Sequence, residues 1–157
     1  MTGARIILPS STESTSVTRP ASSDTLTEGI RIQATAQYMP KDSNPDQKQY
    51  IFAYRIVITN EGTEPARLLS RHWIIIDADN HREEVRGEGV VGKTPEIPPG
   101  ERFEYTSGCP LRTAWGTMEG SYQMERADKR RFRAQIGRFF LVPAAPKASP
   151  ASKQGSM

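Results

Sequence analysis

Alternation of apolar and polar residues is the feature of this sequence that most restricts its fold. It runs through residues 30–38 and 50–60, where side chains such as Ile32 and Phe52 fall on one face. A period of two is that of a β-strand with one buried face. Further segments of the same kind lie at 68–77, 83–86, 103–106, 115–124 and 132–141.

These segments predict an all-β protein, because no stretch shows a convincing helical period. Turn signals recur about every 8–12 residues, which is typical of two antiparallel sheets packed face to face. Within 132–141 the alternation changes phase at Gly137, which is the pattern of a β-bulge. We therefore expect a seven-stranded antiparallel β-sandwich.

The two ends of the chain differ in composition from this body. Residues 1–26 are rich in Ser and Thr, and residues 144–157 are rich in Pro, Ala and Lys. Such segments bury too little apolar surface to offset the entropy of the chain. We expect disordered tails at 1–26 and 144–157 around one domain at 27–143. For residues 1–24, organelle targeting is the alternative that we do not favour.

Length, cysteine content and charge narrow the class of protein. The chain has 157 residues and one cysteine, Cys109, so an internal disulfide is excluded and a reducing compartment is expected. No apolar run approaches the ~20 residues that cross a bilayer. The net charge of +3 comes from basic residues gathered within 126–157. We expect a cytoplasmic protein that has no membrane partner.

A glycine-rich stretch, Arg82–Gly100, interrupts the strands. Gly87, Gly89 and Gly92 fit the GxGxxG pattern, in which glycines open a helix that faces a dinucleotide pyrophosphate. Three prolines follow by position 99, so no helix of useful length can form here. A Rossmann-type site is therefore excluded, and we expect a shaped surface loop.

Two interpretations of this loop stay open. The glycines either permit a bulge or a positive φ where the chain turns, or their amides hold a phosphate in an anion nest. Arg86 and Lys93 flank the glycines and would assist an anion, whereas Glu88 would oppose one. Trp115 is a further candidate contact residue, because it falls at a polar position of its strand; alternatively, it caps the end of the sandwich.

The sequence shows no arrangement suited to catalysis or metal binding. His72 and His81 lack the spacing of metal ligands, and a polar hairpin tip accounts for the residues between them. Glu83 and Glu84 are adjacent in a strand, so their carboxylates point to opposite faces and cannot act as an acid–base pair. We expect no catalytic residue, no bound metal and no cofactor, and we predict that the chain is not an enzyme.

Basic residues cluster between Arg126 and Arg133. Such a run is either a solvated connection or a contact for an acidic partner or nucleic acid. No aromatic stacking platform is interleaved with it, so nucleic-acid binding is not favoured.

Several motifs resemble those of the ApaG family, from Gly29 to about Pro143. They are Tyr50–Ile56, Leu68–Trp73, Glu84–Gly92, Pro99–Glu101, Tyr105–Gly108 and Gly116–Tyr122. The resemblance implies an immunoglobulin-like or fibronectin type III-like β-sandwich and no established enzymatic activity. Bacterial members look like companions of diadenosine tetraphosphate hydrolase and are linked to cobalt and magnesium resistance. Similar eukaryotic domains, in an F-box adaptor and a polymerase delta interacting protein, imply protein binding.

These observations lead to a non-enzymatic binding domain. We expect a protein-interaction module that uses the glycine-loop end, with Arg86, Gly87, Gly89, Gly92, Lys93 and Trp115 as the candidate contact residues. The alternative is a small-anion binder that takes a pyrophosphate or a dinucleotide polyphosphate, tied to cobalt or magnesium homeostasis. A nucleotide-binding role of the glycine motif is only suggested within the family.

Overall fold

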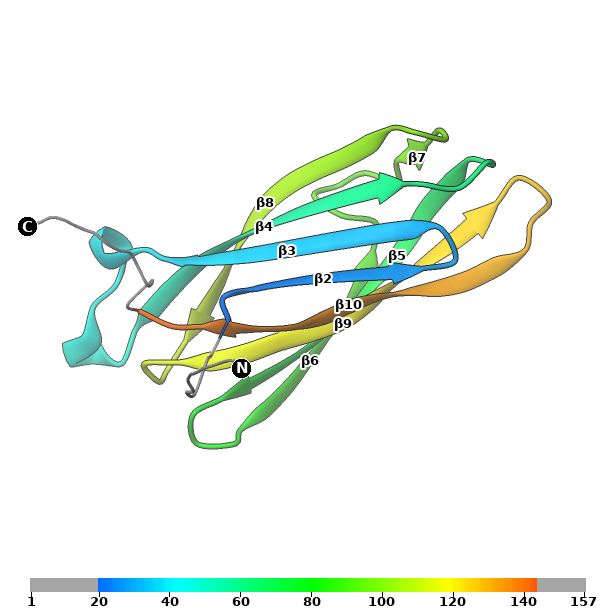
Figure 1. The fold of residues 1–157 in the computed structure, drawn as a ribbon. Helices are drawn as coiled ribbons and strands as arrows, with labels where there is room; N and C mark the ends of the chain where they lie inside the picture. Colours follow the sequence, from blue (N-terminus) through cyan, green and yellow to red (C-terminus); the bar gives the residue numbers. More distant parts are fainter. Residues whose placement is uncertain (1–19, 144–157) are drawn as a thin grey trace, which may run out of the picture.

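The computed structural model describes residues 20–143, which form two antiparallel sheets packed face to face (Figure 1). One sheet has the order β10-β9-β5-β6, with β7 paired to β5, and the other has the order β2-β3-β4-β8. The strands are β2 (Ser22–Thr27), β3 (Ile30–Tyr38), β4 (Tyr50–Asn60), β5 (Ala66–Asp77), β6 (Arg82–Glu88), β7 (Glu96–Ile97), β8 (Arg102–Leu111), β9 (Gly116–Arg126) and β10 (Arg131–Leu141). Two short 3-10 helices, η1 (Pro40–Asp42) and η2 (Pro45–Gln47), precede β4.

The all-β class and the two-sheet arrangement predicted from the alternation are confirmed. The immunoglobulin-like or fibronectin type III-like type stays a prediction. No helix within residues 20–143 is long and apolar enough to cross a membrane. The expectations for residues 1–19 and 144–157 lie outside the described residues.

The number of strands differs from the expectation, because β2 and β7 are additional. Strand β2 lies in the segment expected as a tail, and the fold therefore begins before residue 27. It pairs with β3 from Ser22↔Thr35 to Thr27↔Ile30. The turn between them has positive φ at both Glu28 and Gly29, as a two-residue hairpin requires. Backbone pairing thus holds a segment that has few apolar side chains.

Side chains of alternating residues from both sheets meet in one core. Phe52, Tyr122 and Phe139 are among its largest fully buried side chains. Trp73 packs edge-on against Tyr122 and Phe139, with ring centroids 6.4 Å and 6.1 Å apart. The bulge predicted at Gly137 is confirmed by a register shift in β10, and β5 contains a second, unpredicted bulge between Leu68 and Ser70.

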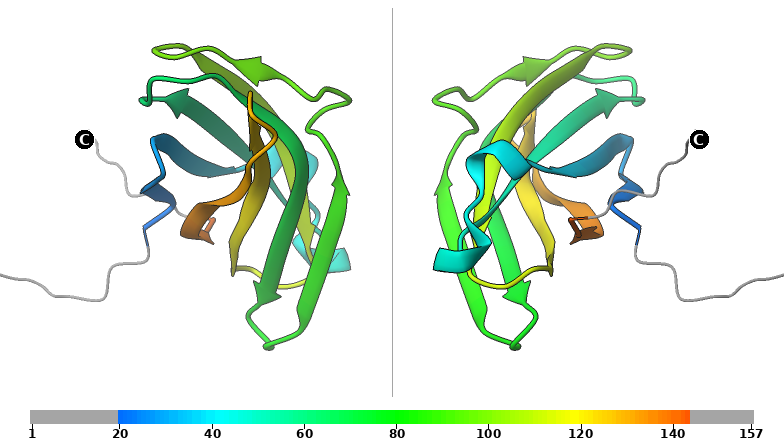
Figure 2. Two further views of the ribbon diagram at one scale, coloured as in Figure 1. Left: turned by 90° about the vertical axis from the view of Figure 1, so that its right-hand side faces the viewer. Right: turned by 90° about the vertical axis from the view of Figure 1, so that its left-hand side faces the viewer.

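The two long sides of the sandwich differ. Strands β2 and β10 lie side by side and close one of them (Figure 2). Ser23 Oγ donates to the Gly137 carbonyl at 2.7 Å, and the Phe140 amide donates to the Pro20 carbonyl at 2.8 Å. The other side runs between β6 and β8, which belong to different sheets. We call the first the closed side and the second the open side.

Candidate functional site

The glycine-rich stretch forms a tight hairpin at the open side, and we call residues Gly87–Lys93 the glycine hairpin. The amide of Val90 donates to the Lys93 carbonyl at 2.8 Å, and the amide of Lys93 donates to the Val90 carbonyl at 2.9 Å. Val91 and Gly92 form the two-residue turn, with φ of 43° and 78°. Positive φ at both central residues is the geometry of a type I′ turn. The chain continues into β7 without a helix, as the prolines predict.

A different physical constraint explains why glycine occupies each of the three positions. A Cβ at Gly87 would lie 2.7 Å from Nη2 of Arg71, so this position seats the guanidinium. Gly89 has a φ of 61°, and a Cβ there would lie 2.2 Å from the Lys93 carbonyl oxygen. Position 92 has open space around it, and glycine is favoured there because φ is positive. Turn geometry and packing therefore account for the spacing of the motif.

The backbone amides of the glycine hairpin are largely bonded within the protein. Besides the amides of Val90 and Lys93, that of Gly89 donates to the Leu69 carbonyl at 2.8 Å. In this conformation these three amides already have acceptors. An anion nest would have to use other donors.

Two neighbouring valines of the hairpin differ in burial. Val90 is buried in the core cluster, whereas Val91 is 53% exposed. A β-branched residue is rarely found at positive φ, because its side chain crowds the backbone. Strain of this kind persists only where the surroundings enforce it, and it is concentrated at functional sites. Val91 therefore presents an exposed apolar side chain on a strained turn.

Arg71, in the middle of β5, clamps the glycine hairpin. Its Nη1 donates to the carbonyls of Glu88 and Gly89, both at 2.9 Å. The side chain is half-buried and forms no ion pair with a carboxylate anywhere in residues 20–143. Sequence reasoning missed Arg71 as a site residue.

Arg71 lies in a cleft between the two sheets at the open side. Two adjoining pockets of about 310 Å³ and 280 Å³ share Tyr54, Arg71 and Ser107 in their walls. The first pocket lies beneath the glycine hairpin, and its other lining residues are Glu88, Val90, Val91, Gly92 and Tyr105. Trp73 and Cys109 line the second. The indole Nε1 of Trp73 is buried and has no hydrogen-bond partner among the described residues.

Burial keeps the two phenols and the thiol of this cleft neutral. It raises the pKa of the Tyr105 phenol, although the hydrogen bond to Tyr122 and the charge of Arg71 act in the opposite direction. Burial likewise raises the pKa of the Tyr54 phenol, and it raises that of the Cys109 thiol to about 12. No phenolate or thiolate therefore compensates the Arg71 charge at neutral pH.

The other predicted contact residues are only partly brought together. Arg86 lies on β6, where its side chain is 71% exposed and contacts Glu84 at 3.4 Å. Lys93 is exposed at the base of the turn. Trp115 lies elsewhere: the neighbouring Gly116 pairs with Asp77. That place is roughly 20 Å along β5 from the row of Gly87, at ~3.3 Å per residue.

Trp115 is also not a free aromatic side chain. It is half-buried and stacks on Phe140, with ring centroids 6.2 Å apart and planes at 29°. This contact agrees with the alternative interpretation, in which the tryptophan caps the end of the sandwich. Trp115 is therefore separate from the glycine hairpin.

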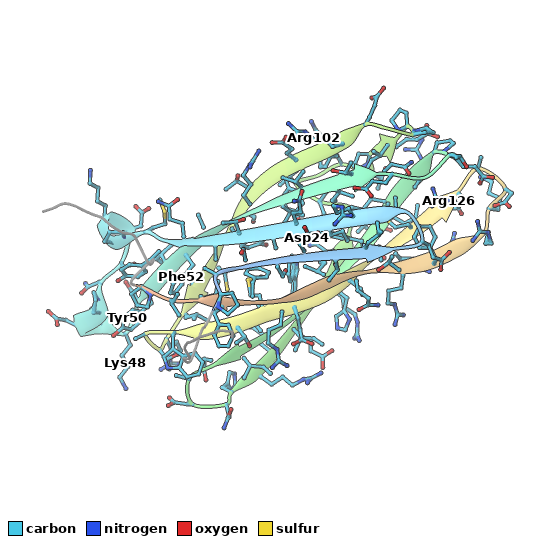
Figure 3. All side chains as sticks on the ribbon, in the orientation of Figure 1. Asp24, Lys48, Tyr50, Phe52, Arg102 and Arg126 are labelled. Carbon is cyan, nitrogen blue, oxygen red and sulfur yellow. The ribbon has the colours of Figure 1, made fainter. Side chains whose placement is uncertain are left out.

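The basic cluster is largely engaged within the protein. Arg126 lies at the end of β9 (Figure 3). It is buried and donates to the carbonyls of Glu64 and Glu28 at 2.8 Å and 2.6 Å. Its guanidinium also lies 5.0 Å from the centroid of the Phe132 ring. Arg130 pairs with Glu28, and Arg131 pairs with Glu125. Much of this charge therefore ties neighbouring loops and strands together.

The histidines have ordinary polar surroundings. His72 contacts Glu84, with 2.9 Å between Nε2 and Oε1, and His81 lies exposed beside a hairpin tip. The residues from 20 to 143 contain no group of three or more His, Cys, Asp or Glu side chains placed to hold a metal ion.

Together these features define a class: β-sandwich domains that present an anchored hairpin above a cleft between their sheets. The chain belongs to the ApaG family, since the family model described as the ApaG domain matches residues 40–126.

Relatives of known name support this assignment over most of the chain. The chain is 54% identical to Protein ApaG of Azoarcus sp. (strain BH72) over 113 residues, which are 72% of this chain and 89% of that protein. It is 52% identical to Protein ApaG of Dechloromonas aromatica (strain RCB), over 80% of this chain and 98% of the relative. The crystal structure of the putative ApaA protein from Bordetella pertussis superposes with a TM-score of 0.73 at 47% identity, covering 74% and 95% of the two chains. None of these names states a reaction.

Proposed function

We propose that this chain is a binding module that engages a protein partner through the tip of the glycine hairpin. The observation that carries the proposal is the exposure of Val91 on a strained turn. A flexible loop would lose conformational entropy when it binds, whereas a turn that is already fixed loses little. Buried Val90 and the two hydrogen bonds from Arg71 fix this turn before any partner arrives.

The charges beside the turn support a polar rim around this apolar contact. Lys93 is exposed at its base, and Arg86 projects from the strand that leads into it. Interfaces commonly join an apolar centre to a polar border, where charges contribute more to association rate and specificity than to affinity. Trp115 is left out of this surface, because it lies near the far end of β5.

The alternative, an anion held by the backbone of the glycine hairpin, has less support. The amides of Gly89, Val90 and Lys93 are bonded to carbonyl oxygens, and each would have to exchange its acceptor for the anion. We therefore keep the protein-binding role as the proposed function and treat the chain as non-enzymatic.

The test compares Val91→Asn with Leu26→Asn. Leu26 is the matched control, because within residues 20–143 it is the other exposed large apolar side chain, at 54%, and it lies on β2. Each variant is immobilised, a bacterial lysate is passed over it, and recovered proteins are quantified by mass spectrometry. A candidate partner is then purified and its Kd is measured.

We expect a partner that Leu26→Asn retains and Val91→Asn binds about 5-fold to 30-fold more weakly, the range for loss of a 1–2 kcal/mol contact. Asparagine tolerates positive φ well, so Val91→Asn should also be at least as stable as the wild type. If every recovered protein binds both variants equally, the hairpin tip is not the contact surface.

A further inference from the structure

Arg71 carries a charge that nothing in the described structure neutralises. It is half-buried between the sheets, where solvent screens it less than at the surface. Buried charges in proteins are normally paired. Within residues 20–143, the recorded partners of its guanidinium are the two neutral carbonyls of Glu88 and Gly89. This arrangement holds the hairpin and leaves the positive charge available.

The free donors of Arg71 have the geometry that recognises an oxyanion. A guanidinium has five N–H donors. Both carbonyl contacts are made by Nη1, which leaves the edge formed by Nε and Nη2. That edge presents parallel N–H groups that match the two oxygens of a carboxylate or phosphate group.

The walls of the cleft suit a small polar ligand. The pocket beneath the glycine hairpin has a volume of about 310 Å³, at the lower end of the ~300–1,000 Å³ typical of ligand sites. Ser107 and Tyr105 from β8 also line it and carry hydroxyl groups, of which that of Tyr105 is hydrogen-bonded to the hydroxyl of Tyr122. Glu88 also lines this pocket and opposes an anion, although its carbonyl, not its carboxylate, contacts Arg71.

We propose that this cleft binds one oxyanion, a carboxylate or a phosphate group, through the Nε–Nη2 edge of Arg71, with the hydroxyls of Ser107 and Tyr105 beside it. The site uses side chains between the sheets and not the backbone amides of the glycine motif. Val91 also lines this pocket, but the oxyanion is held by the Arg71 guanidinium and not by the exposed Val91 side chain, so substitutions at the two residues test the two proposals separately.

The test is a ¹H–¹⁵N NMR titration of the full chain at constant ionic strength. Inorganic phosphate and acetate are the two probes, and they separate a phosphate ligand from a carboxylate ligand; sodium chloride is the blank. Two signals report directly on the cleft: the Nε–H of Arg71 and the indole N–H of Trp73, which lines the adjoining pocket. Trp115→Phe identifies the Trp73 signal, because the chain has two tryptophans.

Three variants separate binding from structure. Arg71→Gln removes the charge, and Arg71→Lys keeps it but loses the bidentate edge. Arg55→Gln is the control, because Arg55 is an exposed arginine of β4 that pairs with Glu104. Each variant is first checked for native strand signals in the same spectra.

We expect at least one probe to shift both wild-type signals saturably, with a Kd of about 1 mM, the level of a few modest contacts. Affinity should fall at least about 10-fold in Arg71→Gln, the loss of one charge-assisted hydrogen bond, and be unchanged in Arg55→Gln. If neither probe shifts the wild-type signals beyond the chloride blank, or if Arg71→Gln binds as well as the wild type, Arg71 serves only to hold the hairpin. A wild type that does not respond overturns the proposal whether or not the variants fold.

Discussion

The contact between Gly87 and Arg71 makes a sharp quantitative prediction. The structure gives Gly87 no positive φ, so alanine suits its backbone. Replacing a glycine inside a strand by alanine should by itself stabilise the fold by about 0.5–1 kcal/mol. However, the added Cβ would lie 2.7–2.9 Å from three atoms of the Arg71 guanidinium. The side chain of Arg71 must therefore move away.

Moving Arg71 breaks its two hydrogen bonds to the hairpin carbonyls. Bonds to a charged donor contribute about 1.5–3 kcal/mol each, and we reduce this to about 1 kcal/mol each because the side chain is half-exposed. Gly87→Ala should therefore destabilise the protein by about 1–1.5 kcal/mol. In an Arg71→Ala background the obstacle is absent, and the same change should stabilise the protein by about 0.5–1 kcal/mol. The coupling energy is then about 2 kcal/mol.

Urea unfolding of the four proteins of this cycle, followed by tryptophan fluorescence, measures the coupling. Gly108→Ala is the control, because its Cβ would meet one backbone atom at an ordinary 3.6 Å, and it should be neutral or slightly stabilising. A coupling below about 0.5 kcal/mol, the usual limit of additivity, would refute the conclusion that Gly87 is a seat for Arg71.

Three further predictions concern the frame around the cleft. Asn60→Ala removes three hydrogen bonds of a fully buried amide and should cost about 3 kcal/mol in urea unfolding, at about 1 kcal/mol each. Gly120→Ala would place a Cβ 2.0 Å from the His72 carbonyl oxygen, so the β5–β9 ladder should open and circular dichroism should show a loss of folded protein or more than about 4 kcal/mol of stability. Burial raises the pKa of the Cys109 thiol to about 12, so Cys109 should react with iodoacetamide at pH 8 only as fast as the protein unfolds. The contribution of this buried thiol to stability should be complete below pH 9 and lost as the pH rises to about 12.

Each of these has a clear contrary result. A loss below about 1 kcal/mol in Asn60→Ala would mean that water replaces its contacts. A Gly120→Ala protein with wild-type stability would mean that the two strands can separate at little cost. Fast alkylation of native Cys109, at the rate of the urea-unfolded chain, would mean that the thiol is accessible and more acidic than its burial indicates.

Most of the sandwich follows from the alternation, because large apolar residues mark the inner face of β3, β4, β8, β9 and β10. Strand β2 lacks this row of large apolar residues. Its side chains toward β10 are hydroxyls, such as Ser23 and Thr25, which bond to carbonyls of β10. A strand held by polar contacts has the composition of a tail, so the pattern placed the boundary too late.

Arg71 shows how a site residue can be missed although its signal is present. Counting alternate positions forward from Leu68 places Arg71 on the outer face, while counting back from Trp73 places it on the inner face. The two counts disagree because the chain bulges between Leu68 and Ser70. That disagreement is itself the pattern of a bulge, and it marks an arginine that faces the core.

The glycine motif could be located from the sequence, but the role of each glycine could be assigned only from the structure. Spacing alone cannot distinguish a glycine that admits a ligand from one that admits a side chain of the same protein. Here Gly87 admits Arg71, whose position depends on the partner strand, and Gly89 and Gly92 serve the turn.

The sheet order has a practical consequence for how the domain is delimited. A fragment confined to residues 40–126, the range of the family match, would lack β2, β3 and β10. In the whole molecule β3 covers one edge of β4, and β10 covers one edge of β9. Without them, two long apolar strands would each present a row of unsatisfied backbone groups, the template on which chains aggregate. The smallest piece that keeps these strand edges covered should therefore run from about Pro20 to Pro143.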